Sequence, residues 1–149
     1  MRAVAQRVRD CSVVVDDETV AAVARGLLVY LGVTHKDTRQ DAEYLAEKIV
    51  NLRVFADAQG KMNRSVAELG YEIVVVSQFT LYGDVRRGRR PSYDAAARPE
   101  QARELYQAVI DALAARGVPT FGGRFQARME VSCVNEGPVT ILIDSQKQF

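Results

Sequence analysis

The chain has 149 residues, 48% of them hydrophobic and 26% charged, and its 20 Lys and Arg side chains balance 19 Asp and Glu. This size and composition are typical of one globular domain that buries its own core, and they exclude a disordered or fibrous chain. A net charge of +1 excludes recruitment of nucleic acid by overall charge, so such a partner has to bind a local basic patch.

Cysteine content and hydropathy indicate the compartment. Cys11 and Cys133 are the only two cysteines and lie far apart in the sequence, which is no disulfide framework and favours a reducing environment. No apolar run approaches the roughly 20 residues of a membrane span, and the first residues lack an apolar signal segment. We therefore expect a cytoplasmic protein without a membrane partner.

The first part of the chain predicts β-structure. Residues 12–15 read Ser-Val-Val-Val and run into the acidic segment 16–18, so we expect a hairpin whose second strand lies near residues 19–23. Arg25-Gly26 predicts a break. The apolar run 27–33 then predicts a further strand, which is apolar throughout and so buried on both faces.

Two amphipathic helices are predicted, one in each half of the chain. Thr38 followed by Asp41 approximates a capping box, and apolar residues then recur at helical spacing at Ala42, Leu45, Ile49 and Leu52. Pro99 and Glu100 suit the first turn of the second helix, which ends before Gly117. Its apolar stripe comprises Ala102, Leu105, Tyr106, Val109, Ile110 and Leu113.

The central strand candidate ends in polar side chains. The apolar run 73–76 predicts a strand buried on both faces, and Ser77, Gln78 and Thr80 follow it. If extended geometry continues, Gln78 and Thr80 share one face while Ser77 and Phe79 share the other. A core strand that hydrogen-bonds into a turn is the structural alternative.

A basic segment follows the central strand. Gly88 and Pro91 keep this segment irregular, and it carries four arginines within five residues: Arg86, Arg87, Arg89 and Arg90. Guanidinium groups bind phosphate oxygens in a fork geometry, so the segment can contact an RNA backbone. A solvated charged loop is the alternative.

The remaining segments complete a single domain over residues 1–149. Between residues 54 and 71 we expect a loop with a short strand and its tip at Gln59-Gly60. Residues 129–134 and 139–143 predict the last two strands. There is no internal repeat and no linker, so the pattern indicates one α/β domain of strands and two main helices.

Several common chemistries lack their residues. His35 is the only histidine and has no cluster at metal-ligand spacing around it, so neither a zinc site nor a Ser-His-Asp triad is predicted. The segments Gly122-Gly123 and 83–88 fit neither the P-loop nor the dinucleotide fingerprint. No pair of carboxylates stands out as a general acid and base. We therefore expect no metal and no cofactor.

Two motifs nevertheless resemble a known family. The segments Ser77-Gln78-Phe79-Thr80-Leu81 and Asn135-Glu136-Gly137-Pro138-Val139-Thr140 resemble, in order and spacing, the paired signature of the D-aminoacyl-tRNA deacylases. The similarity extends over the whole chain, through residues 1–8, 26–29, 57–63, 90–92 and 123–125. From the predicted elements and this similarity we expect a mixed, strongly curved or barrel-like sheet packed by two main helices.

The resemblance implies an esterase that removes a D-amino acid, and glycine in some contexts, from the 3′ end of a tRNA. Its catalytic residues would be Ser77, Gln78, Phe79 and Thr80. It also implies a homodimer in which a cis peptide of one subunit enters the active site of the other and rejects an L side chain. Those residues would be Gly137 and Pro138, braced by Arg7. An ordinary turn and an exposed strand charge are the respective alternatives.

Two mechanisms and two rival functions stay open. Thr80 could be a nucleophile with Gln78 holding an oxyanion, but no adjacent base is visible to activate it. We favour oxyanion stabilisation by backbone N–H groups near Phe79 and Thr80, with the ribose 2′-hydroxyl assisting water. The rivals are an RNA-binding module without catalysis, which would use the arginine segment, and a hydrolase for another small ester or amide.

Overall fold

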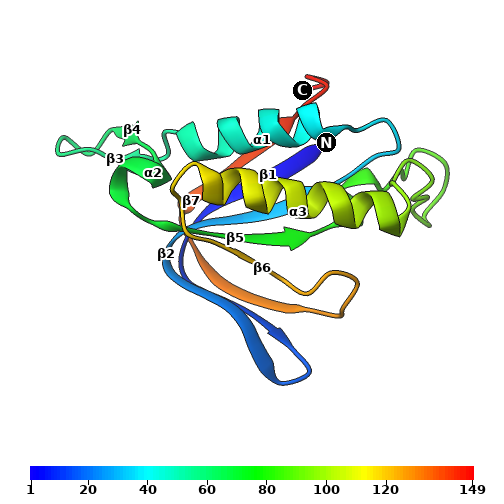
Figure 1. The fold of residues 1–149 in the computed structure, drawn as a ribbon, viewed down its shortest axis with the longest axis horizontal. Helices are drawn as coiled ribbons and strands as arrows, with labels where there is room; N and C mark the ends of the chain where they lie inside the picture. The colour runs from blue at the N-terminus through cyan, green and yellow to red at the C-terminus, as the bar shows by residue number, and fades with distance from the viewer.

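A five-stranded mixed sheet organises the chain (Figure 1). The computed structural model describes residues 1–149 and orders the strands β6-β5-β2-β1-β7. Their bounds are Arg2–Val15 (β1), Glu18–Gly32 (β2), Glu72–Ser77 (β5), Thr120–Gly122 (β6) and Glu130–Asp144 (β7). β1 pairs antiparallel with β2 and β7, whereas β5 runs parallel to β2 and β6. The mixed sheet is confirmed, but β6 and β7 are free edges, so the barrel-like closure is wrong.

The long β1–β2 hairpin confirms one prediction and corrects another. Asp16 and Asp17 make the predicted acidic turn with φ of 48° and 64°, a twist that suits a two-residue hairpin. The predicted break at Arg25-Gly26 is wrong, because β2 continues through it. A Cβ on Gly26 would lie 1.7 Å from the Glu72 carbonyl oxygen, so this glycine permits the close approach of β5.

Helices α1 (Arg39–Asn51) and α3 (Pro99–Ala115) pack on one face of the sheet, as Figure 1 shows. The predicted capping box is present, because the Asp41 carboxylate accepts a hydrogen bond from the Thr38 N–H at 2.8 Å. Both predicted helices are therefore confirmed. Neither these nor the shorter helices have the length and hydropathy needed to span a membrane.

Short elements lie between residues 54 and 71 and directly after β5. The segment between residues 54 and 71 contains β3 (Phe55–Ala56), β4 (Met62–Arg64) and the single-turn helix α2 (Val66–Leu69). β3 and β4 form a hairpin whose tip includes Gly60, at φ +79°. A 3-10 helix, η1 (Phe79–Tyr82), directly follows β5.

The sheet bends along the β1–β2 hairpin (Figure 1), and β5 is covered on both of its faces. Ile73 and Val75 lie in the core under the helices, while Val74 and Val76 pack in a second core against the far half of the hairpin and the start of β7. All four side chains are buried, as predicted. The end of β5 is thus held from both sides, and the polar residues that follow it leave the core at a defined place.

Candidate active site

The first motif begins where β5 ends. Ser77 lies opposite Leu31 of β2, and the Gln78 N–H donates to the Leu31 carbonyl at 2.8 Å. The chain then turns into η1, so extended geometry does not continue beyond Gln78. Gln78 and Thr80 still lie together, because Nε2 of Gln78 donates a hydrogen bond to Oγ1 of Thr80. Phe79 points outward and is 57% exposed.

A cavity of about 650 Å³ opens beside this motif, a size typical of small-ligand sites. Thirteen of its 17 lining residues are hydrophobic. The lining comes from the ends of β2 and β5, the start of η1, residues 93–97 after the arginine segment, α3, and residues 125–131 up to the start of β7. Its polar and aromatic lining residues are Ser77, Gln78, Phe79, Tyr93, Tyr106, Phe125 and Gln126. The sequence does not predict the aromatic walls, because they come from segments that only the fold brings together.

Tyr106 connects the cavity wall to the sheet. Its hydroxyl donates to the Val75 carbonyl at 2.8 Å and lies 3.3 Å from the carbonyl oxygen of Gly123. Its ring packs against Phe125 with centroids 5.8 Å apart. Burial raises the pKa of Tyr106 to about 12, so the phenol is neutral at physiological pH.

Alkaline unfolding should report on this tyrosine. The unfolded chain loses the Tyr106 proton near pH 10 and the folded chain near pH 12, so the free energy of unfolding should fall as the pH rises through that window. Tyr106→Phe should cost about 1 kcal/mol at pH 8 through the lost hydrogen bond, and should show a shallower decline above pH 10. Urea unfolding at pH 8, 10 and 11 measures both.

The matched control is Tyr44→Phe, because the Tyr44 hydroxyl makes no hydrogen bond within the chain. This control should follow the wild-type pH dependence. A decline in Tyr106→Phe as steep as in the wild type would show that other groups with a raised pKa, such as Tyr30 or Cys11, account for it.

The second motif interrupts the pairing of β7 with β1. Gln6 pairs with Thr140 and Val8 with Asn135, so residues 136–139 bulge out of the ladder. We call residues 136–139 the Gly-Pro loop. Its Gly137–Pro138 peptide is cis. The two strands predicted over 129–134 and 139–143 are therefore one strand, β7, with this loop inside it.

Arg7 and Asn135 hold the base of the Gly-Pro loop. Nε of Arg7 donates to the Glu136 carbonyl at 3.2 Å, and Nη1 donates to the Val54 carbonyl at 2.5 Å. Nδ2 of Asn135 donates to the carbonyls of Arg7 and Val139, each at 3.0 Å. The Arg7 side chain is only 15% exposed, so it is not an exposed strand charge.

The sequence pattern did not predict that Asn135 holds the base of the Gly-Pro loop. The signal that points to it is an amide side chain directly before the Gly-Pro loop, since Asn side chains often hydrogen-bond the backbone that follows them.

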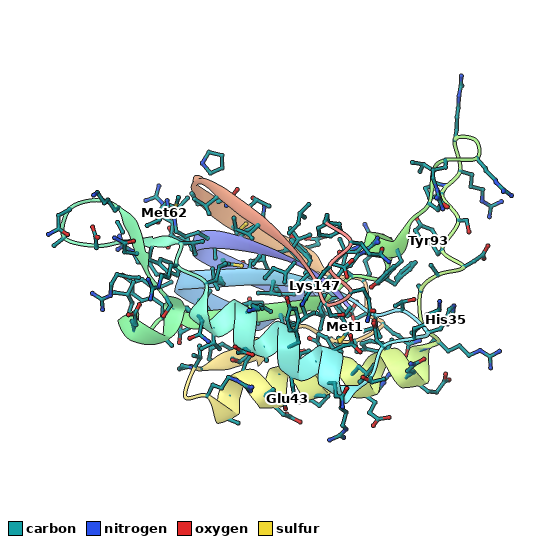
Figure 2. All side chains as sticks on the ribbon, turned by 90° about the horizontal axis from the view of Figure 1, so that it is seen from above. Met1, His35, Glu43, Met62, Tyr93 and Lys147 are labelled. Atoms are coloured by element: carbon teal, nitrogen blue, oxygen red, sulfur yellow. The ribbon has the colours of Figure 1, made fainter.

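The two motifs lie far apart within one chain. Arg7, beside the Gly-Pro loop, pairs with Leu27, whereas Ser77 pairs with Leu31, four residues further along β2. Four residues and three strand spacings separate the motifs by about 20 Å measured along the sheet. In Figure 2 the hairpin with Met62 and the loop with Tyr93 lie at opposite ends of the molecule. The chain alone does not bring the motifs together.

The arginine segment is a projecting loop at the cavity mouth. Asp84 and Ser92 exchange backbone hydrogen bonds at 2.8 and 2.9 Å, which closes the base of the loop. Hydrogen bonds from the Arg86 side chain lower the pKa of Asp84 to about 2. The other three arginines are exposed and form neither ion pairs nor side-chain hydrogen bonds: Arg87, Arg89 and Arg90. Phosphate binding by this loop stays a prediction.

Comparison with known proteins assigns the family. Residues 4–144 match the family model described as D-Tyr-tRNA(Tyr) deacylase. The chain belongs to this deacylase family. A D-aminoacyl-tRNA deacylase from Desulforudis audaxviator is 60% identical over 149 residues, and one from Symbiobacterium thermophilum is 56% identical. Both alignments cover all of this chain and 100% and 99% of the relatives.

Solved structures share the fold of this chain. The c-Myc DNA Unwinding Element Binding Protein superposes with a TM-score of 0.90 at 40% identity, over 97% of this chain and 98% of its own. A probable eukaryotic D-amino acid tRNA deacylase gives a TM-score of 0.80 over 95% and 97% of the two chains. Its 20% identity makes this second likeness one of fold alone.

Other reactive groups of this deacylase-family chain lie outside the motifs. Nε2 of His35 is 2.6 Å from the Asp94 carbonyl oxygen, and no three His, Cys, Asp or Glu side chains converge as metal ligands. Burial raises the pKa of the Cys11 thiol to about 11, which disfavours the nucleophilic thiolate at neutral pH. The polar side-chain groups that line the cavity are amides and hydroxyls.

Proposed function

We propose that the chain hydrolyses the ester bond of D-aminoacyl-tRNA, and of mischarged glycyl-tRNA, to free amino acid and tRNA. The observation that carries the proposal is the Ser77-to-Thr80 motif at the rim of an aromatic-walled cavity, in a member of the deacylase family. The cavity can receive the terminal nucleoside, whose base binds aromatic and apolar walls, while the ester lies at the polar rim. The proposed site of action is the cytoplasm.

The contacts of Thr80 favour attack by water over attack by its hydroxyl. Its oxygen accepts a hydrogen bond from Gln78, and no carboxylate or imidazole hydrogen-bonds to it. A nucleophilic hydroxyl needs such a base. The N–H groups of Phe79 and Thr80 begin η1 and have no acceptor within that helix, so they are suited to an oxyanion. The ribose 2′-hydroxyl, next to the ester, would then assist water.

Selection of the D form would require a second subunit. The two motifs are about 20 Å apart along the sheet, so a Gly-Pro loop that contacts the ester has to come from another copy of the chain. We infer a homodimer in which the loop places backbone atoms where an L side chain would project. A D side chain points elsewhere, and glycine has no side chain to exclude.

A paired assay tests the function directly. The purified protein is incubated with D-tyrosyl-tRNA and, separately, with L-tyrosyl-tRNA, and amino acid release is followed. We expect cleavage of the D ester alone. Cleavage of both esters would retain the esterase and remove the argument on chirality. Binding of tRNA without cleavage of either ester would favour the RNA-binding module.

The arginine loop should supply local phosphate contacts. Replacing Arg87, Arg89 and Arg90 together by glutamine should weaken tRNA binding, and should reduce the slope of log Kd against log salt concentration by about 2 to 3. Fluorescence anisotropy at several salt concentrations measures the slope. The control replaces three exposed basic residues elsewhere: Arg9, Arg53 and Lys147. An equal change in slope with this control would mean that the attraction is not local to the loop.

A further inference from the structure

Phe79 and Tyr93 form an aromatic pair at the mouth of the cavity. Their ring centroids are 5.0 Å apart at an interplanar angle of 72°. Both rings line the cavity, yet Phe79 is 57% exposed and Tyr93 39% exposed. Two large aromatic faces left in water at a cavity rim are unusual for a core-forming pair, and they indicate a binding surface.

The fold positions Tyr93 against the first motif. Tyr93 directly follows Ser92, whose backbone pairs with Asp84 at the base of the arginine loop. A Cβ on Gly83 would lie 3.1 Å from the Tyr93 ring, so the glycine lets this ring lie against the end of η1. The aromatic pair therefore links the arginine loop to the residues at the ester site.

The charges next to the pair suit a nucleic acid strand. Three unpaired guanidinium groups lie a few residues before Tyr93, on the loop that projects from this end of the molecule in Figure 2. Proteins bind single-stranded RNA by stacking its bases on aromatic side chains and by pairing its phosphates with basic side chains. An apolar peptide would gain nothing from the three arginines.

We propose that Phe79 and Tyr93 form a stacking site for the penultimate base of a tRNA 3′ end, with the arginine loop contacting the phosphates that precede it. The inference rests on the proposed function for one point, which is the terminal nucleoside in the cavity. The next nucleotide then leaves the cavity past the aromatic pair. The site is tolerant of base identity, because every base has a face that can stack.

Binding of an uncharged RNA tests the stacking site without any ester. The probes are a labelled RNA hairpin with a single-stranded 3′ CCA end, and the same hairpin with an abasic penultimate nucleotide. The abasic change should weaken binding to the wild type about 5- to 150-fold, the range for one stacked base. Tyr93→Leu should lose a similar factor with the intact probe and respond little to the abasic change, whereas Tyr93→Phe should behave as wild type.

Two further variants complete the design. Phe121→Leu removes an equally exposed ring on β6 that does not line the cavity, and it should keep the full abasic effect. If Tyr93→Leu fails to fold, Phe79→Leu tests the same prediction. The stacking site would be overturned if the abasic change did not weaken binding to the wild type, or if it weakened binding to both leucine variants as much as to the wild type.

The outcomes separate this inference from the proposed function. Cleavage of D-tyrosyl-tRNA together with no abasic effect would retain the function and overturn the stacking site. An abasic effect that depends on Tyr93, with neither ester cleaved, would retain the stacking site and overturn the function.

Discussion

Replacing Gly137 by alanine is expected to lower the ratio of D-tyrosyl-tRNA to L-tyrosyl-tRNA hydrolysis about ten-fold or more, chiefly by admitting the L ester. The backbone at Gly137 has φ +119°, which side chains disfavour, and a Cβ there would lie 2.8 Å from Nη2 of Arg7. Strain of this kind costs about 1–3 kcal/mol, so the Gly-Pro loop has to shift and Arg7 with it. A shift of the loop that lowers the discrimination between the two esters by about 1.4 kcal/mol changes the ratio ten-fold.

Initial rates with both esters measure this ratio, and thermal unfolding checks that the variant is folded. Gly117→Ala is the matched control, because Gly117 has φ +80° but nothing within 4 Å of the added Cβ. This control should lose some stability and keep the wild-type ratio. A wild-type ratio in folded Gly137→Ala would mean that the Gly-Pro loop does not exclude the L side chain.

In the proposed homodimer, mixed dimers test which subunit supplies the loop. One chain carries Gly137→Ala and an intact first motif, while the other carries Gln78→Ala and an intact Gly-Pro loop. If the loop acts across the dimer, the mixed species contains one complete site and should regain D-selective cleavage at about half the wild-type level. If the loop acts within its own chain, no complete site exists and the mixture should resemble the two single variants.

A tRNA ending in 2′-deoxyadenosine, charged with D-tyrosine on its 3′-hydroxyl, is expected to be hydrolysed about 10²- to 10⁴-fold more slowly than the normal ester. This is the range for one lost group that assists proton transfer. Thr80→Ala should in contrast retain substantial turnover of the normal ester, because no residue is placed to activate its hydroxyl. Single-turnover kinetics with saturating enzyme compares the chemical steps.

The control for the threonine is Thr19→Ala, at an exposed position of β2 distant in sequence from the motif. It should be indistinguishable from the wild type. Complete loss of activity in Thr80→Ala, together with normal cleavage of the deoxy substrate, would reverse the assignment and make Thr80 the nucleophile.

Local patterns predicted the two main helices and the acidic turn correctly. The capping box at Thr38 and Asp41, the apolar stripes of α1 and α3, and the acidic turn at Asp16 all depend on residues within one or two turns of each other. Such interactions act in any context, so the sequence shows them directly. The same holds for the buried run 73–76, whose side chains are apolar on both faces.

Strand limits were predicted less well, because pairing partners decide them. Arg25-Gly26 reads as a break, yet both residues lie within β2, since Gly26 faces the backbone of β5. Residues 135–138 read as a connection between two strands, yet β1 pairs with β7 on both sides of the bulge. Closure of the sheet likewise depends on its edges, which no local pattern reports.

The sequence by itself determined the family, the two motifs and the two main helices, because these depend on residue identity and local spacing. Only the tertiary structure decided that the motifs lie at separate places on one chain, that Asn135 holds the base of the Gly-Pro loop, and that Tyr93 meets Phe79 at the cavity mouth. These contacts join segments far apart in sequence. Their positions follow from how the sheet pairs and curves, and no local pattern encodes that arrangement.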